Sequence, residues 1–226
     1  MEIQLYTVEA GDGFPFILLH GNGEEHSYFR HQIEFFSQYY HVYAPDTRGH
    51  GRTPRGEAPF TIRQFADDLR EWMLSASIAK AHLLGFSDGG NIALCFALQY
   101  PELVEKLVID GANLFPAGVK PSVQRGIEMG YRLACRFARR SEKARLHAEL
   151  LGLMVNEPNI RPQELQSIAA PTLVMAGTND MILETHTRLI ADSLPNSKLL
   201  FIPGDHFIAA KNPAKFNQAV LHFLQA

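Results

Sequence analysis

The stretch Gly85-Phe86-Ser87-Asp88-Gly89-Gly90 says most about the fold of this chain. It follows an apolar run, Ala81–Leu84, which predicts a strand, and it precedes Asn91–Leu98, which predicts a helix. A turn this tight between a strand and a helix leaves no room for side chains at its flanks, so glycine is needed there. Such a turn holds Ser87 at the positive end of the helix, which predicts a nucleophilic serine.

Composition indicates an ordinary globular domain. The chain has 226 residues, of which 46% are hydrophobic and 20% are charged, enough for one domain with a full core. A net charge of −3 argues against nucleic acid or an anionic membrane as a partner. Only Cys95 and Cys135 are present, which predicts free thiols in a reducing compartment. Without a signal-peptide pattern or a long apolar run, we expect a cytoplasmic protein.

Short apolar runs alternate along the chain with amphipathic stretches, a pattern typical of a parallel sheet covered by helices. The runs lack polar alternation, as expected for strands that are buried on both faces. Central strands are predicted at Phe14–His20, Tyr40–Pro45, Ala81–Phe86, Lys106–Gly111, Pro171–Gly177 and Lys198–Pro203. The earlier segment Ile3–Glu9 does alternate, and it predicts an antiparallel edge strand.

Helix starts are marked by residues that cap or open helices. Ser27 and Thr61 are expected to cap helices with one apolar face, and Pro213 fits the first turn of a C-terminal helix. From 114 to 167, apolar and basic residues mix at helical spacing and no strand is predicted. We interpret residues 114–167 as a helical lid inserted into an α/β core of residues 1–113 and 168–226. Its basic residues are interpreted as a solvated face.

A glycine-rich segment, His20-Gly21-Asn22-Gly23, directly follows the first central strand. A backbone that turns sharply there can point N–H groups at a developing negative charge. We expect the backbone N–H groups of Asn22 and Asp88 to form an oxyanion hole beside Ser87.

Two later segments supply an acid and a base. Asp180 follows one predicted strand in Gly177-Thr178-Asn179-Asp180, and His206 follows the next in Gly204-Asp205-His206-Phe207. A carboxylate can hold an imidazole in the tautomer that accepts the serine proton, so we predict a Ser87–His206–Asp180 triad. Asp110, which ends the strand before the lid, is the competing carboxylate, and we interpret it as a turn or supporting residue.

With these segments in this order, nearly the whole chain resembles the α/β-hydrolase superfamily. The run Pro45-Asp46-Thr47-Arg48-Gly49-His50-Gly51-Arg52-Thr53 is similar to the D-x-R-G-x-G-x-S loop of lidded members, with Thr53 in place of serine. The resemblance implies a three-layer sandwich around a mostly parallel sheet, a lid between strands six and seven, and no cofactor. It also supports Asp180 and His206 as acid and base. Because the chain is short, we expect about seven to eight strands.

The leading functional prediction is a serine carboxylesterase that cleaves small-molecule esters through a Ser87 acyl-enzyme. The same triad would serve for enol-lactones, carbon–carbon bonds or amino-acid esters. A receptor that binds its ligand without turnover, in a hydrolase-like pocket, is an alternative of another class.

Acidic residues near Ser87 bear on the substrate. The Asp88 carboxylate, with Glu24 or Glu25, would bind an ammonium group near the acyl carbon, although a helix N-terminus favours such a charge without any substrate. No pair of histidines has metal-binding spacing beside a carboxylate, so no metal site is predicted. The sequence does not indicate an oligomeric state.

Overall fold

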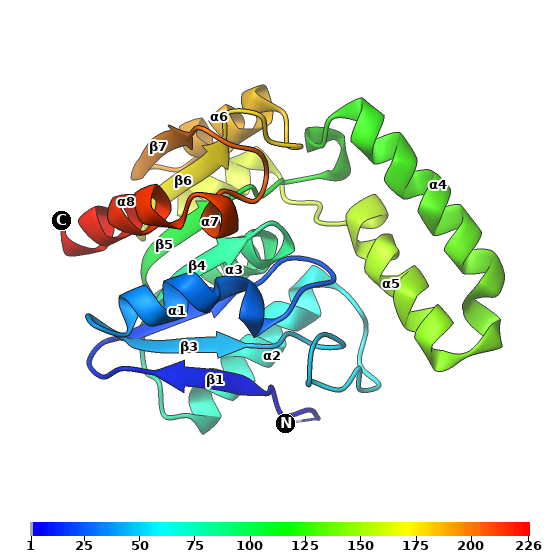
Figure 1. Cartoon of the computed structure of the whole chain (residues 1–226), viewed down its shortest axis with the longest axis horizontal. Coiled ribbons are helices and arrows are strands. Elements are labelled where there is room, and N and C mark those ends of the chain that lie inside the picture. Colours follow the sequence, from blue (N-terminus) through cyan, green and yellow to red (C-terminus); the bar gives the residue numbers. More distant parts are fainter. Residues whose placement is uncertain (1) are drawn as a thin grey trace.

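The computed structural model describes residues 2–226. Its strands are β1 (Thr7–Ala10), β2 (Pro15–Leu19), β3 (His41–Pro45), β4 (Ala81–Phe86), β5 (Val104–Asp110), β6 (Thr172–Gly177) and β7 (Ser197–Ile202). They form a seven-stranded sheet in the order β1-β3-β2-β4-β5-β6-β7 (Figure 1). β1 runs antiparallel to β3, and the other pairings are parallel. The predicted α/β class with a mostly parallel sheet is therefore confirmed.

Helices cover both faces of the sheet (Figure 1). One face carries α1 (Arg30–Phe36), α7 (Ile208–Lys211) and α8 (Pro213–Gln225), and the other carries α2 (Ile62–Ser75), α3 (Asp88–Gln99) and α6 (Glu184–Ser193). Short 3-10 helices lie between these elements: η1 (His26–Phe29), η2 (Pro101–Leu103), η3 (Pro116–Gly118), η4 (Ala138–Arg140) and η5 (Pro162–Ser167). Among the residues described, no helix is both long and apolar enough to cross a membrane.

The central strands bury side chains toward both helical layers. In β4, Leu83 packs with residues of α2 and α3, whereas its neighbour Leu84 packs with residues of α1 and α8. Both side chains are fully buried, and burial of a leucine contributes about 1.5–3 kcal/mol to folding. Because helices cover both faces of the sheet, reactive side chains can reach solvent only at the ends of the strands.

The start of the edge strand and the helix cap at Ser27 were predicted wrongly. The edge strand begins at Thr7 and not at Ile3. Thr7 pairs with Pro45, the last residue of β3, so the residues before Thr7 lie beyond the end of that strand. Ser27 does not cap an α-helix; it lies inside η1, and its hydroxyl donates to Glu25. Thr61, in contrast, caps α2 as predicted, with its hydroxyl accepting the N–H of Gln64 at 3.1 Å.

Between β5 and β6 the chain contains helices and no strand. The two long helices are α4 (Pro121–Phe137) and α5 (Glu142–Asn156), which pack on each other and stand beside the C-terminal ends of the strands (Figure 1). α5 meets the core through the Arg55–Glu149 ion pair at 2.9 Å. α4 packs mainly on α5 and leaves Met129 and Leu133 exposed.

The turn from β4 into α3 brings backbone against backbone. A Cβ on Gly85 would lie 2.2 Å from the carbonyl oxygen of Gly89, and a Cβ on Gly89 would lie 2.0 Å from that of Leu19. Real Cβ atoms do not approach a carbonyl so closely, and neither neighbour is a movable side chain. Glycine at both positions therefore allows α3 to start directly against the ends of β2 and β4.

We expect Gly85→Ala to lower the free energy of unfolding by about 3 kcal/mol, because the added methyl group must displace backbone. Urea unfolding followed by far-UV circular dichroism measures this. Gly126→Ala is the matched control: it lies in α4 with no atom near its Cβ position, and it should add roughly 0.5–1 kcal/mol. Equal stability of the Gly85 variant and the wild type would contradict the steric argument.

Candidate active site

Ser87 lies between β4 and α3 in a strained backbone conformation, with φ of 52° and ψ of −121°. Left-handed φ values are uncommon for residues other than glycine and are found where structure holds a functional side chain. The Ser87 N–H donates to the carbonyl of Asp110 at 2.8 Å, which fixes the turn to β5. The strain therefore presents the hydroxyl at the rim of the sheet.

The structure brings the three residues of the predicted triad together. His206 Nε2 lies 3.0 Å from Ser87 Oγ, and His206 Nδ1 lies 2.7 Å from Asp180 Oδ1. Asp180 follows β6 and His206 follows β7, so both loops start at the same end of the sheet as Ser87. Asp180 and His206 are buried. Asp180 Oδ1 also accepts the N–H of Ile182 at 2.9 Å, which holds the carboxylate in place.

The predicted oxyanion donors lie on two neighbouring segments. Asn22 follows β2 and Asp88 begins α3, and the close approach of Gly89 to Leu19 brings these segments together. Among the loop, turn and cap hydrogen bonds of residues 2–226, neither amide N–H donates to a backbone carbonyl. The first N–H groups of a helix have no partner within it, so they are available to an anionic group.

His20 holds in position the oxyanion loop, the segment His20–Gly23 that carries the predicted donor Asn22. Its Nε2 accepts the N–H of Thr47 at 3.0 Å, so Nδ1 carries the proton and donates to the carbonyl of Gly21 at 2.8 Å. Burial lowers the pKa of His20 to about 3, which keeps the ring neutral. The position of this histidine after a strand is visible in the sequence, but its contact with Thr47, in a separate loop, is not.

Asp110 lies beside the triad without joining it. Its side chain is fully buried, and neither carboxylate oxygen has a hydrogen-bond partner in the described part of the chain. Burial, and then the nearby charge of Asp180, raise the pKa of Asp110 well above its usual range. The imidazole of His206 is hydrogen-bonded to Asp180.

The acidic residues proposed to bind substrate have different environments. Both oxygens of Asp88 accept amide N–H groups, from Asn22 at 2.8 Å and from Asn91 at 3.0 Å. Glu25 accepts the hydroxyl of Ser27 at 2.9 Å at the surface. Glu24 accepts the N–H of Gly21 at 3.3 Å, and burial raises its pKa to about 7. The role of Asn91 could not be predicted from the sequence, since it depends on contacts made only in the fold.

One group of potential metal ligands occurs in residues 2–226: Glu25, His26 and Asp46. Asp46 Oδ1 accepts both the N–H and the Nδ1–H of His26 at 2.8 Å, and Oδ2 accepts the N–H of Arg52 at 2.8 Å. These bonds tie Asp46 to His26 and Arg52, so the contacts of this carboxylate are structural.

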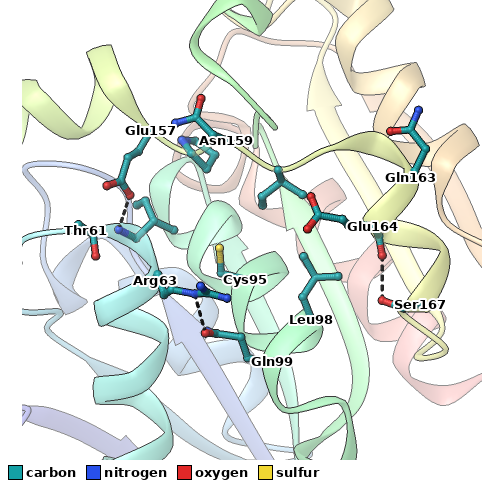
Figure 2. A pocket seen from close by; sticks show the side chains of 13 residues that line it. Thr61, Arg63, Cys95, Leu98, Gln99, Glu157, Asn159, Gln163, Glu164 and Ser167 are labelled. Atoms are coloured by element: carbon teal, nitrogen blue, oxygen red, sulfur yellow. Dashed lines mark hydrogen bonds between the residues drawn. The ribbon is translucent and has the colours of Figure 1, made fainter.

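A pocket of about 770 Å³ lies away from the triad, between α2, α3 and η5 (Figure 2). Cys95 and Gln99 line it from the later turns of α3, and Cys95 is eight residues beyond Ser87, or about 12 Å along the helix axis. Burial raises the pKa of the Cys95 thiol to about 12. Arg63 donates to Gln99 at its wall. This pocket therefore contains no activated nucleophile.

Comparison with known proteins identifies relatives across the chain. A family model described as the alpha/beta hydrolase fold matches residues 15–131. RutD of Caulobacter sp. (strain K31), a proposed carbamate hydrolase, is 28% identical over 252 residues, covering 95% of this chain and 92% of that protein.

Two solved structures resemble the whole chain, each with 25% sequence identity and covering 99% of it. The meta-cleavage product hydrolase CumD of Pseudomonas fluorescens IP01 has a TM-score of 0.80, with 94% of that chain covered. A thermophilic esterase of Thermogutta terrifontis has a TM-score of 0.83, with 93% covered.

Replacement of the unpartnered carboxyl group should stabilise the fold. Because folding raises the pKa of Asp110, the wild type is increasingly destabilised as the pH rises above the unfolded pKa near 4. We expect Asp110→Asn to raise the free energy of unfolding near neutral pH by about 1–3 kcal/mol. The gain should shrink toward about pH 4. Urea unfolding at several pH values measures this, and a gain that does not vary with pH would argue against it.

Proposed function

The chain belongs to the alpha/beta hydrolase family, and we propose that it is a serine hydrolase that cleaves small carboxylic esters. The observation that carries the proposal is the hydrogen-bond chain from Ser87 through His206 to Asp180. These hydrogen bonds connect a strained serine to a buried carboxylate through one imidazole, the arrangement that activates a hydroxyl as a nucleophile. A receptor without turnover would not need it.

The proposed reaction follows from these contacts. Ser87 Oγ attacks the ester carbonyl carbon while its proton passes to His206 Nε2, and Asp180 stabilises the imidazolium that forms. The carbonyl oxygen becomes an oxyanion held by the N–H groups of Asn22 and Asp88. When the carbon–oxygen bond breaks, the leaving alcohol takes the proton from His206. Water, deprotonated by His206, then releases the acid from the acyl-enzyme and restores Ser87.

We further propose that residues 114–167 act as a lid. α5 reaches the oxyanion loop, since the carbonyl of Leu150 accepts a side-chain N–H of Asn22 at 2.9 Å. Leu146 lies close to Gly49 on the same side of the core. A substrate bound at Ser87 would then be enclosed between α5 and the strand ends.

The triad would also serve related bonds, and the names of the relatives include a carbamate hydrolase and a meta-cleavage product hydrolase. A carbamate would be cleaved through the same acyl transfer, whereas a vinylogous diketone requires carbon–carbon cleavage. A panel with equal acyl size, comparing an ester, an enol-lactone, a carbamate and a diketone, separates these chemistries. The proposal requires the ester to have the highest kcat/KM.

We expect Ser87→Ala to lower kcat for a short-chain aryl ester by at least about 1,000-fold, because the nucleophile is lost. The variant should keep its circular dichroism spectrum and unfolding midpoint. Asp180→Asn should lower kcat by about 10,000-fold, since it no longer holds the imidazole in the accepting tautomer. A fluorophosphonate probe should label the wild type at Ser87. Unchanged turnover by the Ser87 variant, or a wild type that resists the probe, would overturn the mechanism.

Among the acidic residues near Ser87, we propose that Glu24 gives the site its preference for cationic esters. Glu24 follows the oxyanion loop in the sequence, and its carboxyl group interacts electrostatically with His206. Burial places its pKa at about 7, so the group is mostly neutral at pH 6 and negatively charged at pH 8.5. The preference should therefore appear as the pH rises.

We expect the wild type to favour an ester with a quaternary ammonium group over a neutral ester of the same size by roughly fivefold more at about pH 8.5 than at about pH 6, where Glu24 is neutral. The quaternary group is used because its charge does not change with pH. Glu24→Gln should remove this change in the ratio of kcat/KM values while leaving neutral-ester turnover similar. Steady-state kinetics on the two esters at both pH values measures the ratio. A pH-dependent ratio that survives in the Gln variant would reject Glu24 as its source.

A further inference from the structure

The carboxylate of Asp88 is occupied by the protein. Asn22 Nδ2 donates to its Oδ2 at 2.8 Å, and Asn91 Nδ2 donates to its Oδ1 at 3.0 Å. Only 8% of the residue is exposed. A carboxylate with both oxygens engaged and little access to solvent is poorly placed to bind a substrate cation, so its role must be sought within the protein.

The two residues joined by this contact are those whose backbone N–H groups would form the oxyanion hole. Asn22 lies on the loop after β2, and Asp88 lies on the first turn of α3, 66 residues later in the chain. Their side chains therefore link the two halves of the hole directly. Without the link, the position of one donor relative to the other would depend on the backbone contact between Gly89 and Leu19.

The contacts extend on both sides of the link. Asn91 is itself held by Asn113, whose side-chain oxygen accepts from Asn91 Nδ2 at 3.2 Å and whose N–H donates to Asn91 Oδ1 at 3.0 Å. Asn22 Nδ2 also donates to the carbonyl of Leu150 in α5 at 2.9 Å. The side-chain amide of Asn22 has two N–H groups, and it donates one to Asp88 and the other to α5.

We propose that Asp88 is a positioning residue: by binding the Asn22 side chain, it holds the backbone N–H of Asn22 at the distance that the oxyanion requires. The Asn22 side chain also connects the oxyanion hole to α5. This inference rests on the proposed function. It predicts an effect on the transition state more than on substrate binding, because the oxyanion exists only during acyl transfer. A displacement of one donor by about 1 Å is enough to cost roughly 100-fold in rate.

The test is a double-variant cycle at the two side chains. Asp88→Ala removes the acceptor and Asn22→Ala removes the donor, so each variant loses the link. We expect each to lower kcat on a neutral aryl ester by about 100-fold with KM changed less than about threefold. Because either single change already breaks the link, the double variant should have a kcat within about tenfold of the slower single variant, whereas independent effects would multiply to a loss of about 10,000-fold.

Asn22→Ala breaks the link from the loop, where a truncated side chain leaves the packing of α3 intact. Glu184→Gln is the matched control. Glu184 is an exposed acid in the first turn of α6. The Gln substitution therefore removes a negative charge from the start of a helix without changing the site. Its kcat should equal that of the wild type.

Three results would overturn the inference: an unchanged kcat in Asp88→Ala and Asn22→Ala, single-variant losses that multiply in the double variant, or a loss confined to KM for cationic esters. The last result would instead identify Asp88 as a substrate-binding residue. These outcomes are distinct from failure of the proposed function, which would appear as a wild type without esterase turnover or fluorophosphonate labelling. Unfolding midpoints for every variant show that the comparison is made between folded proteins.

Discussion

The contact on which the site depends is made by backbone alone, where α3 starts against the ends of β2 and β4. Gly85 and Gly89 allow this approach because any Cβ there would collide with a carbonyl group. The approach forces Ser87 into its strained conformation and sets the first turn of α3 beside the oxyanion loop. The backbone thus places the proposed nucleophile Ser87 and both proposed amide donors, and side chains from later loops complete the arrangement.

Four carboxyl groups discussed for the site are those of Asp180, Asp88, Asp110 and Glu24, and their different partners give each a different character. Asp180 is held by hydrogen bonds from an imidazole and a backbone amide, whereas Asp88 is held by two side-chain amides. Asp110 has no partner and is favoured in its neutral form. Glu24 is half-buried, with a pKa of about 7. The same functional group therefore serves separate purposes within one small region, because burial and neighbouring donors set its charge.

Much of this fold could be predicted from the sequence, since strands buried on both faces appear as continuous apolar runs. The predicted strand Ala81–Phe86 matches β4 residue for residue. The edge strand was misplaced because its start depends on the length of its partner β3. The triad residues follow from their order after strands, but the link from Asp88 to Asn22 does not. It joins residues 66 positions apart, and neither residue has a local pattern that signals the other.

The arrangement of α4 has a consequence for how such an enzyme can change over generations. α4 packs mainly on α5 and leaves much of its surface, including Met129 and Leu133, in solvent. Mutations there disturb few core contacts, so their cost to folding is small. The helix can therefore accumulate variation while the sheet and the loops at its strand ends stay constant.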